Sequence, residues 1–204
     1  MAQPTTILIA EDQGMMRSAL AVLLDLEDDM TVVATVTRGD EVVAAARQAN
    51  PDVVLLDIEL PGRSGLDVIP DLIEAMPGCA VIVVTTFGRP GYLRRALEAG
   101  ARGFLVKDDP VEGLAAAIRQ VLAGEIVVNP QLATQALSAM PNPLSDRERQ
   151  VLSASAGGAT IADIATALHL SPSTVRNYLS SAIGKTSARN RGEALSLARN
   201  RGWL

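Results

Sequence analysis

The stretch PDVVLLDIELPG, residues 51–62, places a carboxylate directly after a short apolar run. Residues 53–56 predict a buried strand, because a strand that is covered on both faces reads as an unbroken hydrophobic run. Asp57 follows at once, and the pair Pro61-Gly62 predicts a turn soon after it. We therefore expect a buried strand that ends in an exposed carboxylate.

Similar apolar runs alternate with segments of helical period throughout the first 124 residues. The predicted strands are residues 5–10, 31–36, 53–56, 80–85 and 103–106, and the predicted helices are residues 15–24, 40–49, 66–75, 90–99 and 110–123. This alternation predicts an α/β domain over residues 1–124, with a doubly wound, five-stranded parallel sheet of the flavodoxin-like type. In such a sheet, ligands bind beyond the carboxyl ends of the strands.

The pattern changes after Gly124. Residues 125–142 contain two prolines, a third follows at position 143, and one short helical stretch lies at 131–139, which predicts a linker with a helix in it. Residues 143–204 carry no strand signals and predict a small all-α domain of four helices, at 145–156, 160–168, 171–185 and 190–201. Ser145 and Glu148 have the spacing of a capping box. The second and third helices are separated by HLSPS, which has the spacing of a helix-turn-helix.

Composition and charge narrow the class of protein. The 204 residues contain no apolar run of about 18 or more, and no basic region precedes the first apolar stretch, so we expect a cytoplasmic protein without a membrane span. One cysteine and one histidine exclude an internal disulfide and a Cys/His zinc cluster. Residues 1–124 carry 18 acidic and 10 basic side chains, whereas residues 125–204 carry 5 and 8, an asymmetry that suits a regulated nucleic-acid binder.

Three acidic residues follow two of the predicted strands. Glu11 and Asp12 come after the first strand, and Asp57 comes after the third. A parallel sheet would bring these strand ends to one edge, where like charges are costly unless a cation neutralises them. Mg²⁺ is the natural candidate, because it binds carboxylate oxygens, water and phosphate.

A hydroxyl and an ammonium group are expected at the same edge. The fourth strand ends in Thr85, and Lys107 follows the fifth. Acids with a metal, a threonine and a lysine suit the formation of an acyl phosphate, with Asp57 as the nucleophile. Lys107 and Mg²⁺ would then stabilise the charge on the transferring phosphoryl group, and Thr85 would hydrogen-bond the product.

In order and spacing, these five residues and Phe104, three positions before the lysine, resemble the receiver domain of two-component response regulators over residues 5–124. The resemblance implies that Asp57 accepts phosphate from a sensor histidine kinase. It also implies that Asp12, Asp57 and the backbone carbonyl of Glu59 bind Mg²⁺, with Glu11 assisting directly or through water. Thr85 and Phe104 would form the switch, in which the threonine moves toward the phosphate and the aromatic ring turns inward.

Residues 143–204 resemble the LuxR-type four-helix DNA-binding domain of the NarL/FixJ regulators. The landmarks are SDRERQVL (145–152), IADIATALHLSPSTVRNYLSSAIGK (161–185) and RGEAL (191–195). The stretches AEDQGMM, LDLEDDM, TTFGRPGYLRRALEAG and KDDPVEGLAAAIR further resemble regulators that control a fatty-acid desaturase in response to membrane fluidity. Control of membrane-lipid genes is what this narrower resemblance implies.

One helix, residues 171–185, is the predicted recognition helix. The residues expected to face the core are Val175, Leu179, Ala182 and Ile183, which leaves Ser173, Arg176, Asn177, Ser180 and Gly184 outward. Arg176 and Asn177 can donate to purine edges in a major groove. By resemblance, Thr174, Tyr178 and Lys185 would hold DNA phosphates. The outward face has few cations, so we expect modest affinity for one copy and binding to promoter DNA as a homodimer.

The leading hypothesis is therefore a transcription regulator that is activated by phosphorylation and is not an enzyme. One alternative is a phosphotransferase or phosphatase of the aspartyl-phosphate type, but such enzymes usually carry a second aspartate where this chain has Glu59. Another is a constitutive DNA-binding protein with a degenerate receiver. The dimer could use the region of the fourth and fifth strands or the first and last receiver helices, or the receiver could instead sequester the DNA-binding helix until it is phosphorylated.

Overall fold

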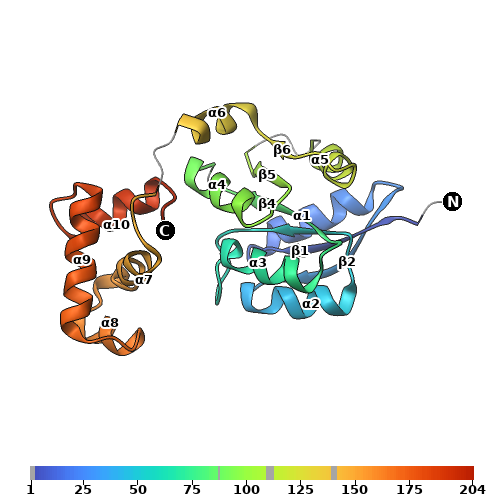
Figure 1. Cartoon of the computed structure of the whole chain (residues 1–204). Coiled ribbons are helices and arrows are strands. Elements are labelled where there is room, and N and C mark those ends of the chain that lie inside the picture. The colour runs from blue at the N-terminus through green and yellow to red at the C-terminus, as the bar shows by residue number, and fades with distance from the viewer. Residues whose placement is uncertain (1–2, 87, 109–112, 139–141) are drawn as a thin grey trace. The chain divides into compact units, whose positions relative to one another are not determined.

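The computed structural model describes residues 3–86, 88–108, 113–138 and 142–204 (Figure 1). The chain divides into two compact units, Met1–Gly88 with Tyr92–Gln135 and Ala136–Leu204 with the short segment Arg89–Gly91. The first unit contains the strands β1 (Thr5–Ala10), β2 (Met30–Val36), β3 (Val53–Leu56), β4 (Ala80–Thr85), β5 (Gly103–Val106) and β6 (Val127–Val128). Its helices are α1 (Gly14–Asp25), α2 (Val42–Ala49), α3 (Gly65–Ala75), α4 (Pro90–Glu98), α5 (Gly113–Leu122) and most of α6 (Pro130–Ser138).

The six strands form one parallel sheet in the order β2-β1-β3-β4-β5-β6. The predicted α/β class and parallel sheet are confirmed, and four of the five predicted strands have the predicted bounds. One connection departs from the expected helices, because a short 3-10 helix, Gly39–Glu41, precedes α2. The predicted start of α5 at 110–112 lies outside the described residues.

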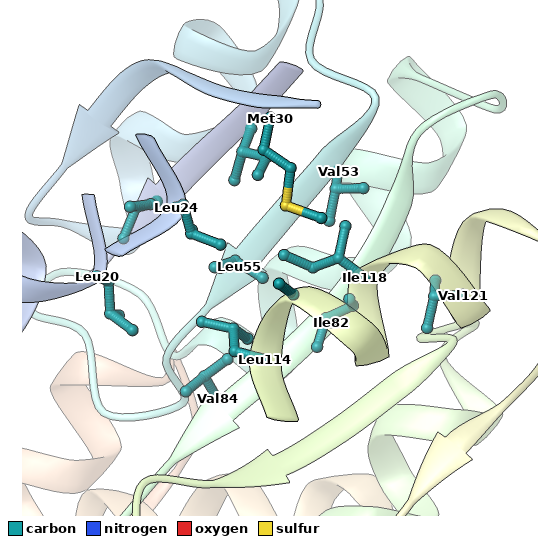
Figure 2. Close-up of a cluster of buried hydrophobic side chains, with 13 residues drawn as sticks. Leu20, Leu24, Met30, Val53, Leu55, Ile82, Val84, Leu114, Ile118 and Val121 are labelled. Atoms are coloured by element: carbon teal, nitrogen blue, oxygen red, sulfur yellow. The ribbon is translucent and has the colours of Figure 1, made fainter. Parts of the chain in front are cut away.

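One face of the sheet packs against α1 and α5. Figure 2 shows side chains from both helices meeting Val53, Leu55, Ile82 and Val84 of the central strands. Strand residues of the other parity, such as Leu8 and Val54, are also fully buried, because α2, α3 and α4 cover the opposite face. A strand that is buried on both faces carries no polar alternation, which explains the apolar run that precedes Asp57.

The segment expected to be a linker begins as part of the sheet. Val127 and Val128 pair in parallel register with Gly103 and Phe104 of β5, so the sheet has six strands and not five. Two residues are too few to give a periodic signal, which is why this strand was not predicted. Leu132 of α6 is also buried, at 5% exposure. The linker therefore starts as receiver structure.

The second unit contains α7 (Asp146–Ala154), α8 (Ile161–Ala167), α9 (Pro172–Thr186) and α10 (Arg191–Asn200). Its core gathers Val151, Ile164, Val175, Leu179 and Trp203. Figure 1 shows these helices in orange and red. The four predicted helices are confirmed, each within about one turn of its predicted bounds.

Polar residues begin each of these helices. Ser145 and Glu148 form the predicted capping box of α7, and Thr160 and Asp163 form a second one at α8. Ser171 caps α9, and Asn190 caps α10. Between α8 and α9, His169 has a φ of 53° and reverses the chain in the tight turn of a helix-turn-helix.

Candidate functional site

The acidic residues meet at the carboxyl edge of β1 and β3. Ala10 pairs with Leu56, and the Asp57 amide donates to the Ala10 carbonyl at 2.9 Å. The next residues, Glu11 and Asp57, are therefore neighbours. The carboxylates of Glu11, Asp12 and Asp57 each offer an oxygen within 4.8 Å of the others. The strand order reverses at β1, so the cluster lies at the switch point where doubly wound sheets bind ligands.

Lys107 is the cation of this pocket. Its Nζ atom lies 2.6 Å from Glu11 Oε2 and 2.8 Å from Asp57 Oδ2, and its side chain is only 3% exposed. Burial alone would lower the pKa of Lys107, but the hydrogen bonds and charges of Asp57 and Glu11 outweigh burial and raise it above its ordinary value. The ammonium therefore stays charged and shields two of the three carboxylates from each other.

Asp57 is not exposed as the sequence suggested. The residue is 2% accessible, because the Lys107 side chain and Glu11 lie over it. Its other oxygen, Oδ1, accepts a hydrogen bond of 3.3 Å from the Glu59 amide. Asp12, in contrast, is exposed and gives the cluster its opening to solvent.

Thr85 and Phe104 lie on the two strands beside the pocket. Thr85 is the last residue of β4, is fully buried, and accepts the Lys107 amide with its carbonyl at 2.8 Å. Phe104 is paired with Val83 on one side and Val128 on the other, and its ring is fully buried. Five of the predicted pocket residues are thus brought to one edge of the sheet, and Phe104 lies behind them in the sheet.

The donor set suits a hard cation. Three carboxylates at one opening supply only oxygen ligands, which is the chemistry that Mg²⁺ prefers. The Glu59 amide contact places the peptide after Asp57 next to the same carboxylate. One buried lysine against three carboxylates leaves negative charge in excess, so the residues fit a divalent ion.

Arg17 also belongs to this pocket and was not predicted from the sequence. It lies in α1, and its Nη1 atom donates to the Glu11 carbonyl at 2.8 Å, with a longer contact of 3.4 Å to the Asp12 carbonyl. The available signal was its spacing. A residue five positions after Asp12, one turn into the following helix, can fold back over the loop that precedes the helix.

In the second unit, α9 has one buried face and one exposed face. Val175, Leu179 and Ala182 are buried, and Ile183 packs at the edge of the same core. Ser173, Arg176, Asn177, Ser180 and Gly184 are exposed, and Thr174 and Tyr178 are half-buried. The Ser171 hydroxyl lies 2.8 Å from the Ser173 hydroxyl and 2.7 Å from that of Thr174, so two expected DNA contacts hydrogen-bond to the helix cap.

Lys185, expected at a DNA phosphate, has a partner inside the protein. Its ammonium lies 2.7 Å from Glu148 Oε2, and Glu148 is 4% exposed. Ser181 donates to the other oxygen of Glu148 at 2.5 Å. Burial alone would raise the pKa of Glu148, but the bonds from Lys185, Ser181 and Ser145 lower it to about 2. The Lys185 side chain is 41% exposed, so the ammonium also faces solvent.

Each of the two units matches a known protein family. Residues 7–119 match the response regulator receiver domain, and residues 142–198 match the bacterial regulatory proteins of the luxR family. The chain belongs to the two-component response regulators of the NarL/FixJ type. As such, this response regulator joins a receiver to a DNA-binding helix-turn-helix domain and acts in transcription regulation.

Relatives of similar length support the assignment. The uncharacterized transcriptional regulatory protein YvfU of Bacillus subtilis is 47% identical over 200 residues, covering 97% of this chain and 98% of YvfU. The transcriptional regulatory protein DesR of Bacillus subtilis is 44% identical over 199 residues, covering 98% of each. Among solved structures, the response regulator ChrA of a heme-sensing two-component system is 30% identical with a TM-score of 0.58, covering both chains fully.

Over residues 3–86, 88–108, 113–138 and 142–204, no helix combines the length and the apolar character needed to cross a membrane.

Proposed function

We propose that a sensor histidine kinase phosphorylates this response regulator on Asp57, and that the phosphorylated protein dimerises and binds promoter DNA. The observation that carries the proposal is the pocket at the switch point of the sheet. Its three carboxylates lie within 4.8 Å of one another, and Lys107 lies 2.8 Å from Asp57. A structural ion pair needs only one carboxylate for one lysine, whereas a phosphorylation site needs additional carboxylates to bind a divalent cation.

The proposed chemistry is direct phosphoryl transfer. An Asp57 oxygen attacks the phosphorus of a kinase phosphohistidine, the new P–O bond forms as the P–N bond breaks, and the bonding electrons leave with the imidazole. Lys107 neutralises charge beside the phosphoryl oxygens, since it already reaches Asp57. Asp12, Asp57 and the Glu59 carbonyl would hold Mg²⁺, with Glu11 assisting, and the bound ion would supply positive charge to the transferring group.

Thr85 and Phe104 form the proposed switch. Thr85 ends the strand next to β3, so a side chain at that position faces the same edge as Asp57. Phe104 already has its ring inside the sheet and lies next to Val128 of β6. A shift of the Thr85 hydroxyl toward the phosphate would change the packing of the neighbouring strand β5 and of β6, which leads out of the receiver.

We propose a regulator and not an enzyme with turnover. The aspartyl-phosphate enzymes considered above place an aspartate where Glu59 stands, and here the Glu59 side chain is exposed. Phosphorylation should proceed once per chain, followed by slow hydrolysis. Repeated consumption of an external phosphate ester at this site would favour the enzyme.

For the dimer, the structure favours the face of the first and last receiver helices. Met15 and Val22 of α1, and Leu26 directly after it, are 88%, 61% and 74% exposed, although all three are apolar. Leu122 at the end of α5 and Ile126 after it are also exposed, at 42% and 58%. Because α1 and α5 pack over the same core cluster, their exposed apolar residues are candidates for an interaction surface, and we assign that surface to a second copy of this chain.

The proposed DNA contacts are the exposed residues of α9. Arg176 and Asn177 would read base edges, with Ser173 and Ser180 beside them, while Thr174, Tyr178 and Lys185 would contact phosphates. Control of membrane-lipid desaturation stays a prediction of the narrower resemblance. The chain is slightly more similar to YvfU than to DesR, at 47% against 44% identity, so mapping of its binding sites in the genome of its host would decide the target.

One experiment tests the proposal. Wild type and Asp57→Ala are incubated with acetyl phosphate and Mg²⁺, the attached phosphate is measured by mass spectrometry, and the molar mass is measured by sedimentation. We expect a phosphorylated dimer only for wild type. A wild type that takes no phosphate would contradict the pocket assignment.

Two variants test the dimer face. Leu26→Asp should accept phosphate but stay monomeric, because a carboxylate in the interface would be buried without a partner. Val33→Asp is the matched control, since Val33 is also an exposed apolar residue, on β2. A phosphorylated wild type that stays monomeric would indicate release of the DNA-binding domain instead of dimerisation.

A further inference from the structure

The loop after β1 has two backbone carbonyl groups that lie past the last hydrogen bonds of the sheet. The ladder between β1 and β2 ends where the Glu11 amide donates to the Val36 carbonyl at 3.0 Å, and on the β3 side the last bond uses the Ala10 carbonyl. The carbonyls of Glu11 and Asp12 come next. Backbone carbonyls at the end of a strand need another donor, or water, to stay satisfied.

Arg17 is that donor. Its Nη1 atom approaches the Glu11 carbonyl at 2.8 Å and the Asp12 carbonyl at 3.4 Å, so one guanidinium spans both acidic residues through their backbone. The Gln13 amide also donates to Glu11 Oε1 at 3.1 Å, and the Arg17 amide donates to the Gln13 carbonyl at 2.9 Å. The loop and the first turn of α1 are therefore fastened to each other at several points.

The contact has a second effect. Glu11, Asp12 and Asp57 bring three carboxylates together against one buried ammonium. A guanidinium bonded to these two carbonyls places positive charge near the carboxylates without occupying their oxygens, because it bonds the main chain and not the side chains. The carboxylate of Asp12 stays exposed and available to a ligand.

From this geometry we propose that Arg17 is a positioning residue for the metal site, which holds the Glu11-Asp12 loop so that both carboxylates face a Mg²⁺ ion. The inference rests on the proposed function, since it assumes that the cluster binds Mg²⁺. Arg17 does not touch the metal. It acts as groups behind metal ligands generally do, by fixing the orientation of the ligands before the ion arrives.

The test is calorimetric titration of the full-length protein with MgCl₂, without a phosphate donor, for wild type, Arg17→Met and Arg17→Lys. Removal of a group that orients metal ligands typically costs about 10-fold in metal affinity, and we expect this loss for Arg17→Met. Arg17→Lys keeps a cationic donor and should recover part of the loss. Arg47→Met is the matched control, because Arg47 is an exposed arginine of α2 and should leave the affinity unchanged.

Melting temperatures in metal-free buffer separate positioning from plain stabilisation. A positioning role predicts weaker Mg²⁺ binding with little change in melting temperature, and a structural role predicts the reverse. Wild-type affinity in Arg17→Met would overturn the inference and leave the proposed function intact. If Arg17→Met does not fold, Arg17→Gln decides, since it lacks the charge and the reach of the guanidinium, and wild-type affinity in that variant overturns the inference. A wild type that does not bind Mg²⁺ would instead overturn the proposed metal site itself.

Discussion

Each unit of the molecule is built around a buried carboxylate that is paired with a lysine, but the two clusters differ in charge balance. In the receiver, Lys107 serves both Glu11 and Asp57, and Asp12 adds a third negative charge at the opening. In the DNA-binding unit, Glu148 alone faces Lys185, and both of its oxygens are satisfied by protein donors.

This difference in charge balance distinguishes a structural ion pair, in the DNA-binding unit, from a cation-binding site, in the receiver. The Glu148 cluster balances one carboxylate with one lysine, so it joins α7 to α9 and needs no further cation. The receiver cluster is short of positive charge and is open to solvent at Asp12, so it favours a cation. The ion-pair distances alone do not distinguish the two clusters, because Lys107 lies 2.8 Å from Asp57 and Lys185 lies 2.7 Å from Glu148.

The largest effect is expected from Lys107→Met. The substitution leaves Glu11 and Asp57 buried without a cation and should lower the free energy of unfolding of the receiver by about 4 kcal/mol. MgCl₂ should restore part of this loss, because the ion replaces the missing charge. Urea unfolding followed by circular dichroism, with and without Mg²⁺, measures both.

Lys185→Met is the matching substitution in the DNA-binding unit. It should lower the free energy of unfolding of this unit by less than Lys107→Met lowers that of the receiver, since the Lys185 side chain is 41% exposed. Mg²⁺ should not restore the lost stability. The single tryptophan, Trp203, lies in the core of this unit, so its fluorescence follows this unit alone. Equal recovery by Mg²⁺ in both variants would erase the proposed difference between the clusters.

A smaller effect is expected from Glu148→Gln. Loss of the charged hydrogen bonds to Lys185 and Ser181 should lower the free energy of unfolding by about 2 kcal/mol at pH 7. The pKa of Glu148 falls from 4.5 to about 2 on folding, so its stabilisation is complete above pH 4.5 and is lost as the pH falls toward 2. Trp203 fluorescence in urea should show this acid-dependent loss in wild type, and much less of it in the variant.

The smallest effect on stability is expected on the exposed face of α9. Arg176→Ala should leave the free energy of unfolding within about 0.5 kcal/mol of wild type, because the side chain is exposed. It should nevertheless weaken binding of a duplex, selected from a random library by wild type, by about 10-fold. Arg147→Ala removes the same charge from α7 and is the control. An equal loss in both variants would assign the effect of Arg176 to net charge.

Apart from β6, the sequence was sufficient for the fold, because the signals of the other elements were local. The apolar run at 53–56 and the capping boxes fix their own elements, and parallel pairing then brings Glu11 and Asp57 together. Two of the misses depend on contacts between segments far apart in the chain. The burial of Asp57 depends on how Lys107 folds over it, and the partner of Lys185 lies 37 residues away, in another helix.

The strand β6 has a consequence for experiments on isolated receivers. It covers the outer edge of β5, so a fragment cut after Gly124 would expose the backbone of Gly103 and Phe104 along an unpaired edge. Exposed edge strands pair with other chains and promote aggregation. A fragment, or a fusion to another output domain, that is joined after Gln135 keeps this edge covered, and the exchangeable module is therefore longer than the receiver motif itself.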